Sequence, residues 1–137
     1  MIIKKTLNGL DASDREKIKK TGTFVIPTDI HEIGDSAFCE CEGLERIVIP
    51  ANIINILQFA FLDCKDLKEV KIEGGAYVIS RDAFINCKIE RLILGKKLSE
   101  EQALDRISQM KVALGNDDFD IYFEDSNVNP DESENGI

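Results

Sequence analysis

The apolar residues of this chain recur with a period of 23 residues between positions 24 and 94. Each unit opens with a short segment of β-type: Phe-Val-Ile-Pro at 24–27, Ile-Val-Ile-Pro at 47–50 and Val-Lys-Ile-Glu at 70–73. Two apolar positions follow at fixed distances, and then the order Ala-Phe-x-x-Cys. A fixed period of this length is typical of stacked repeats, in which each unit buries its apolar side against its neighbours.

The same register continues towards the start of the chain. Moved back by one period, it places Ile3 under Ile26 and Ile18 under Cys41. Residues 1–23 are therefore expected to form a degenerate first unit, as terminal repeats often do. The order Ser-Asp-Arg-Glu at 13–16 predicts a capping box that opens a short helix, with a glycine at 22 near its end.

The other end of the chain predicts a longer helix, from about Ser99 to Leu114. Ser-Glu-Glu-Gln at 99–102 is a second capping-box order, and Gly115 stands where a left-handed C-cap residue belongs. The helix has one apolar face, at spacings of three, three and four: Leu104, Ile107, Met110 and Leu114. The alternation at 119–123 then predicts a strand, so that the helix covers the open end of the core.

These patterns predict one repeat domain followed by a tail. The expected parallel strands lie near residues 2–4, 24–26, 47–49, 70–72, 92–94 and 119–123. The domain covers residues 1–124 and divides into a first unit at 1–23, three clear repeats at 24–94 and a C-terminal cap at 95–124. Residues 125–137 are almost free of apolar side chains, which predicts a disordered acidic tail.

The consensus of the repeats resembles that of the BspA-like leucine-rich repeat family. It consists of apolar-x-apolar-Pro, then x-x-Ile-x-x-Ile, then Ala-Phe-x-x-Cys-x-x-Leu. The third repeat departs from it, with Glu73 in place of proline and Ala76 in place of isoleucine. The resemblance implies a right-handed solenoid with a parallel β-sheet on one face, and binding rather than catalysis. The fold class expected is thus an α/β repeat, with short helical or irregular segments on the other face and a C-terminal capping helix plus strand.

The chain carries a net charge of −9 that is unevenly spread. Residues 117–137 hold eight acidic and no basic residues, which leaves 17 basic against 18 acidic residues in the rest. No basic stripe is present to displace counterions, so nucleic-acid binding is not expected. No apolar run approaches the length of a membrane span, so membrane insertion is not expected either. The absence of a visible signal peptide favours a cytoplasmic protein, with a removed leader or delivery to a host cell left open.

Candidate chemistry is sparse. Cys41, Cys64 and Cys87 occupy one repeat position and are interpreted as a buried ladder of reduced thiols, with a metal or redox site as the minor alternative. Cys39 lies outside this ladder, and His31, the single histidine, is interpreted as a solvated turn residue. No catalytic residue, metal site or cofactor is therefore predicted.

The remaining signal lies on the outward face of the predicted sheet. One outward row is largely apolar and consists of Ile2, Val25, Val48, Lys71 and Ile93, with Tyr122 as its continuation. The neighbouring row consists of Thr23, Arg46, Glu69 and Arg91, and its charged members alternate in sign. An exposed apolar strip rimmed by charge is typical of an interaction surface, although β-propensity alone would also place valine and isoleucine there.

The sequence therefore predicts a non-enzymatic module that binds a protein partner of unknown identity on the sheet face. A structural protein that self-associates through its charged ends is the alternative, because residues 1–22 carry a net charge of +3, from six basic and three acidic residues, opposite the acidic tail. A monomer or a weak head-to-tail oligomer is expected. A small enzyme or metal protein that uses the cysteines is a third, less favoured hypothesis.

Overall fold

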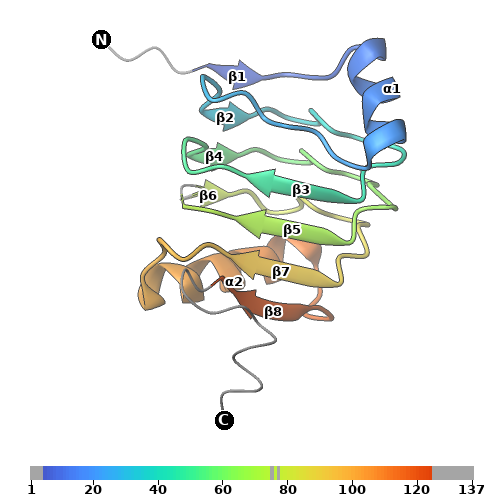
Figure 1. The fold of residues 1–137 in the computed structure, drawn as a ribbon. Coiled ribbons are helices and arrows are strands. Elements are labelled where there is room, and N and C mark those ends of the chain that lie inside the picture. Colours follow the sequence, from blue (N-terminus) through green and yellow to red (C-terminus); the bar gives the residue numbers. More distant parts are fainter. Residues whose placement is uncertain (1–4, 75, 77, 125–137) are drawn as a thin grey trace.

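A computed structural model describes residues 5–74, 76 and 78–124 of the chain. Its elements, in chain order, are β1 (Thr6–Leu7), α1 (Ala12–Thr21), β2 (Glu32–Ile33), β3 (Arg46–Ile49), β4 (Asn55–Ile56), β5 (Glu69–Ile72), β6 (Val78–Ile79), β7 (Arg91–Leu94), α2 (Glu100–Leu114) and β8 (Asp120–Phe123). The strands are stacked from the N-terminal to the C-terminal end, with α1 and α2 at opposite ends of the stack (Figure 1).

The strands form two separate parallel sheets. The long-strand sheet has the order β3-β5-β7-β8, and the short-strand sheet has the order β1-β2-β4-β6. In the long-strand sheet Arg46 pairs with Glu69, Glu69 with Arg91, and Arg91 with Asp120. The first two steps follow the repeat register, which confirms the predicted strands at 47–49, 70–72 and 92–94. The pairing of Arg91 with Asp120 confirms the predicted strand at 119–123, which follows α2 in the chain.

The predicted strand at 24–26 is wrong. Phe24 and Ile26 still face the core, and the Phe24 ring packs edge-to-face on Phe38 with centroids 5.4 Å apart. However, the segment accepts backbone hydrogen bonds from Glu45 and Arg46 only at Gly22, before the predicted strand begins. Pro50 has no N–H group, so the bond that Glu73 N makes to Ile49 O one repeat later has no equivalent at Ile26. The predicted strand at 2–4 lies outside the described residues.

The short-strand sheet was not predicted as a sheet. Irregular or helical segments are expected on that side of each unit, whereas Ile33, Ile56 and Ile79, at the second apolar position, pair in register. Leu7 also pairs with Ile33, at a separation of 26 residues, so the 23-residue register predicted for the first unit is wrong at this strand. Each of these strands has two residues. A two-residue strand shows no alternation in the sequence, so the pattern could not reveal it.

The Ala-Phe-x-x-Cys elements form the third side of the stack as tight turns. Left-handed backbone conformations recur at two repeat positions, at Ser36, Phe59 and Asp82 and at Glu40, Asp63 and Asn86. The turns are joined to each other by backbone hydrogen bonds, from Phe38 N to Ala60 O and from Phe61 N to Ala83 O, both 2.7 Å. The repeats at 47–69 and 70–92 are thus hydrogen-bonded to each other on three sides.

The core contains a ladder of phenylalanine rings beside the predicted ladder of cysteines. The rings of Phe38, Phe61 and Phe84 stack nearly parallel, with centroids 4.7 and 4.6 Å apart. The thiols of Cys64 and Cys87 are buried and donate to the carbonyl oxygens of Phe38 and Phe61 at 2.9 and 3.0 Å. The four cysteines are free thiols, as expected.

Both helices have defined caps. The predicted start of α1 at 13–16 is wrong by two residues, because Asp11 is the N-cap and makes the capping box with Asp14. The capping box of α2 joins Ser99 and Gln102, as the sequence predicted. Each helix ends at a glycine with φ of 79°, Gly22 and Gly115, a conformation that favours glycine.

Candidate interaction surface on the long-strand sheet

The outward side chains of the long-strand sheet lie in the two rows that the sequence predicted. Val48, Lys71, Ile93 and Tyr122 are successive register partners, as are the four charged residues Arg46, Glu69, Arg91 and Asp120. Each row therefore runs across all four strands. The side chains differ enough along each row to divide the sheet face into two halves.

The half around β3 is an apolar hollow with a charged border. The hollow has a volume of about 470 Å³, and its lining includes Val25, Val48, Pro50, Arg46 and Glu69. Val25 is 84% exposed and Val48 is 41% exposed. Although residue 25 is not in a strand, the structure thus brings it together with the predicted site residues of β3 and β5.

The two arginines of the charged row have different surroundings. Arg91 donates from Nε to Glu69 Oε1 at 3.0 Å and lies 3.6 Å from Glu90, and the hydrogen bond to Glu69 raises the pKa of Arg91. Arg46 donates to the carbonyl oxygen of Thr21 at 3.1 Å and lies 3.9 Å from Glu45, but it makes no hydrogen bond to a carboxylate within the described residues, and its side chain is about half exposed. Arg46 is therefore better placed than Arg91 to receive a carboxylate from a partner.

Lys71 separates the two halves of the face. It forms an ion pair with Glu124, just beyond the end of β8, and both side chains are partly buried. The hydrogen bond from Lys71 holds the pKa of Glu124 below its ordinary value. Ile93 is a predicted site residue on β7, the strand between β5, which carries Lys71, and β8. Its side chain is only partly exposed. Lys71 and Ile93 are therefore less available to a partner than the sequence suggested.

The half around β8 is acidic. A hollow of about 550 Å³ is lined there by Arg91, Tyr122, Glu90, Asp117, Asp118 and Asp120. Tyr122 is 45% exposed. Glu90 and the two aspartates before β8 were missed as surface residues. The sequence signal was present, but these acidic residues were interpreted only as part of the overall charge of the C-terminal end.

On the outer side of the short-strand sheet, a buried carboxylate already has hydrogen-bond partners within the protein. Glu32 is 6% exposed, and its carboxylate accepts hydrogen bonds from Thr6 Oγ1 at 2.9 Å and from Asn55 Nδ2 at 3.1 Å. Exposed apolar residues also occur on this side, at Ile54 and Val78. Val78, at 52% exposed, is a matched control for Val48 of the long-strand sheet.

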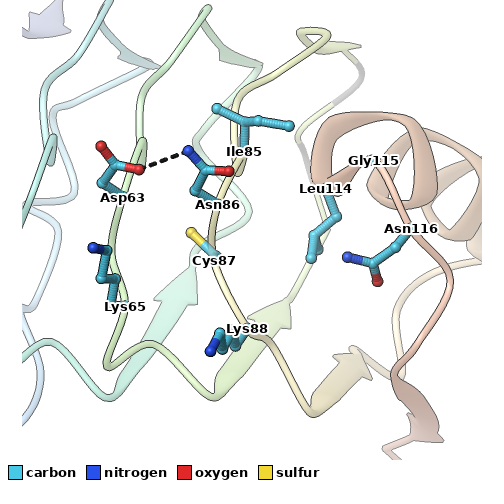
Figure 2. A pocket seen from close by; sticks show the side chains of 9 residues that line it. All are labelled: Asp63, Lys65, Ile85, Asn86, Cys87, Lys88, Leu114, Gly115 and Asn116. Carbon is cyan, nitrogen blue, oxygen red and sulfur yellow. Dashed lines mark hydrogen bonds between the residues drawn. The ribbon is translucent and has the colours of Figure 1, made fainter.

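A further hollow, of about 660 Å³, lies between two turns and the end of α2 (Figure 2). Asn86 and Lys88 from one turn, Asp63 and Lys65 from the other and Leu114 of α2 are among its lining residues. Asn86 donates to Asp63 at 2.8 Å, so part of its polar lining is already hydrogen-bonded. The sequence did not predict this hollow, because it depends on where the helix ends against the turns.

The cysteines do not form a reactive centre. Burial raises the pKa of the Cys41 thiol to about 11, and a hydrogen bond with Cys87 together with burial raises the pKa of Cys64. Partial burial also raises the pKa of Cys39. These thiols are therefore protonated at neutral pH, whereas nucleophiles and metal ligands are thiolates.

Other candidate chemistry is equally limited. Within residues 5–74, 76 and 78–124, no group of three or more His, Cys, Asp or Glu side chains is arranged to hold a metal ion. His31 is partly buried rather than solvated, and its Nδ1 has no hydrogen-bond partner. No described helix is long and apolar enough to cross a membrane.

The repeat register, the parallel sheets and the phenylalanine ladder together define a leucine-rich repeat protein. A family model described as the BspA type leucine rich repeat region, with six copies, matches residues 2–104. The chain therefore belongs to this family. Leucine-rich repeats are associated in general with protein–protein interaction and are typically non-enzymatic. No curated protein and no solved structure matches the chain.

Proposed function

We propose that the chain is a short right-handed leucine-rich-repeat solenoid that binds a protein partner through the β3 half of its long-strand sheet, without catalysis. The carrying observation is the hollow that brings the exposed side chains of Val25 and Val48 together beside Arg46. In this proposal α1 and α2 close the two ends of the solenoid, and the sheet face remains for recognition.

The chemistry of the hollow indicates how a partner would bind. Burial of exposed valine side chains contributes about 25 cal/mol per Å² of apolar area. Arg46 offers a forked donor for a carboxylate of the partner. Glu69 is already bonded to Arg91, so it is expected to fix the register of binding more than its affinity. The predicted partner surface therefore combines an apolar side chain with an acidic one.

Affinity capture with matched variants tests this proposal. The double variant Val48→Asp/Arg46→Glu changes the proposed surface, and Val78→Asp/Arg81→Glu makes the same chemical changes on and beside the short-strand sheet. Both valines are exposed, at 41% and 52%. A true partner is retained by the wild type and by the control variant but lost by the sheet-face variant. Equal retention by both variants would refute the proposed surface.

Self-association through the charged ends is the alternative function, and it remains a prediction. Of the basic residues expected at the N-terminal end, Lys17, Lys19 and Lys20 lie on α1, and the C-terminal end carries the acidic β8 half of the face. Sedimentation at low salt and high protein concentration tests it. Oligomers that dissociate as salt is added would favour this alternative, and a monomer under those conditions would exclude it.

A further inference from the structure

The C-terminal end of the stack is closed on two of its three sides. On the short-strand side, Ile79 N donates to the side chain of Gln109 in α2 at 2.6 Å. On the turn side, Phe84 N donates to Ala113 O of α2 at 3.1 Å. On the third side the long-strand sheet ends with β8, which pairs with β7 and with no other strand among the described residues.

The outer edge of β8 presents backbone groups to a further strand. Asp120 N and Glu124 N donate to Glu90 O and Leu94 O, both at 2.8 Å, so alternate residues of β8 face the β7 side. The N–H and C=O groups of Ile121 and Phe123 consequently face outward. In the part of the chain that the structure describes, they form no hydrogen bond to another segment. An open edge of this kind is a template for β-strand addition.

The side chains around this edge define the charge of an added strand. The acidic hollow contains four carboxylates, and its one cation, Arg91, is already engaged by Glu69 and Glu90. Asp117, Asp118 and Asp120 have no ion-pair partner within the described residues. A second β8 strand would bring more aspartate to the same edge, and like charges disfavour that pairing. A basic strand is favoured instead.

We propose that the open edge of β8 binds an extended segment of another protein in which Lys or Arg alternates with apolar residues. Side chains on an added strand point alternately to the two faces of the sheet. One set lies beside Asp120 and Tyr122 on the outer face, where cations are favoured. The other set lies beside Ile121 and Phe123, and Phe123 is 65% exposed, so apolar side chains are favoured there. This site is separate from the surface around β3.

A synthetic probe tests the proposal on the full chain. The probe is an end-blocked, fluorescent octapeptide of alternating Lys and Val, and its binding is followed by anisotropy. Saturable binding is expected, weaker at high salt. Replacing Lys by Glu in the peptide is expected to weaken binding at least 10-fold. Only one alternate set of peptide amides, that of Val or that of Lys, can face β8. N-methylating that set is therefore expected to weaken binding at least 10-fold more than N-methylating the other set. Equal binding of both N-methylated peptides would overturn strand addition in favour of charge alone.

A matched pair of protein variants separates backbone from side chain. Phe123→Pro removes an outward N–H group without removing the donors that face β7, and edge strands tolerate proline. Phe123→Ala removes the ring but retains the N–H group. Peptide affinity is expected to fall at least 10-fold further in the proline variant than in the alanine variant. Equal affinities would contradict the proposal, and circular dichroism checks that both variants fold.

Hydrogen exchange identifies the occupant independently of the variants. The amides of Ile121 and Phe123 are expected to exchange rapidly in the free protein and to become protected by the peptide. Protection that instead rises with protein concentration alone would assign the edge to a second copy and overturn the proposal. Val48→Asp/Arg46→Glu and Val78→Asp/Arg81→Glu are expected to bind the peptide equally, so this site can fail or succeed independently of the function proposed for the β3 half.

Discussion

The two halves of the long-strand face share one backbone register but differ in chemistry. Around β3 the outward residues are Arg46 and Val48, whereas their register counterparts on β8 are Asp120 and Tyr122. The first half is an apolar hollow beside the half-exposed cation of Arg46, and the second is an acidic hollow beside an open strand edge. The repeat therefore fixes where the outward side chains lie, and their identity decides which partner each half suits.

The largest effect is predicted for a substitution in the hydrophobic core that lies beneath both halves of the face. Phe61 lies between Phe38 and Phe84 in the stacked ladder and is fully buried. Phe61→Ala is expected to lower the free energy of unfolding by about 3–5 kcal/mol, because it leaves a cavity in the centre of the core. Urea denaturation measures this. A loss below about 1 kcal/mol would show that the halves do not rest on one continuous core.

A smaller change in the same core tests whether the cysteines do more than pack. Cys64→Ala is expected to cost about 1–2 kcal/mol through lost packing and the lost hydrogen bond to Phe38 O, with binding at both halves unchanged. Urea denaturation and the peptide titration give the two readouts. Stoichiometric zinc binding by the wild type, or rapid reaction of all four thiols with a thiol reagent, would contradict the packing role.

The boundary between the halves has a defined pH dependence. Because Lys71 lowers the pKa of Glu124, their pair stabilises the fold above the ordinary carboxyl pKa, and this stabilisation is lost as the pH falls through the lowered pKa. Glu124→Gln should therefore cost no more than about 1 kcal/mol at pH near 7, and this cost should shrink as the pH falls through the lowered pKa of Glu124. Denaturation curves at several pH values test this. A difference between variant and wild type that does not change with pH would be inconsistent with this pair.

The smallest predicted effect concerns the residues that follow β8. Deleting 126–137 removes Asp131, Glu132 and Glu134 and keeps every described residue that lines the two hollows. The deletion is expected to leave partner affinity at the β3 half within about threefold and to reduce the salt dependence of association. Stopped-flow association at two salt concentrations measures this. Loss of partner binding on deletion would move the binding site to the C-terminal segment.

Much of the fold could be predicted because the 23-residue period of the sequence places equivalent residues in successive repeats. Strands β3, β5 and β7 and the stacked phenylalanines recur at fixed intervals, so three aligned copies locate them. The segment at 24–26 has the same sequence pattern but lies beside β3 without a ladder, because a strand depends on its neighbour's available groups as well as on its own residues. The two-residue strands could not be predicted, because two residues are too few to show the alternation of a strand.

The candidate site could be predicted only in part, for a different reason. The step from Arg91 to Asp120 is 29 residues, because α2 is inserted, so the period could not align the acidic residues with the face. The sequence also treated Arg46 and Arg91 as equivalent. Only the structure shows that Arg91 is engaged by Glu69 and Glu90. Periodicity places side chains, but it does not show which charges are already paired.

The most direct test compares one substitution at equivalent places on the two halves. Val48 and Tyr122 lie in the same outward row and are similarly exposed, at 41% and 45%. With a purified partner, calorimetric titration is expected to show that Val48→Asp weakens binding by about 30-fold or more, which corresponds to about 2 kcal/mol, while Tyr122→Asp changes it less than about threefold. Both variants should keep the wild-type thermal midpoint. The reverse order of effects would contradict the assignment of the partner to the β3 half.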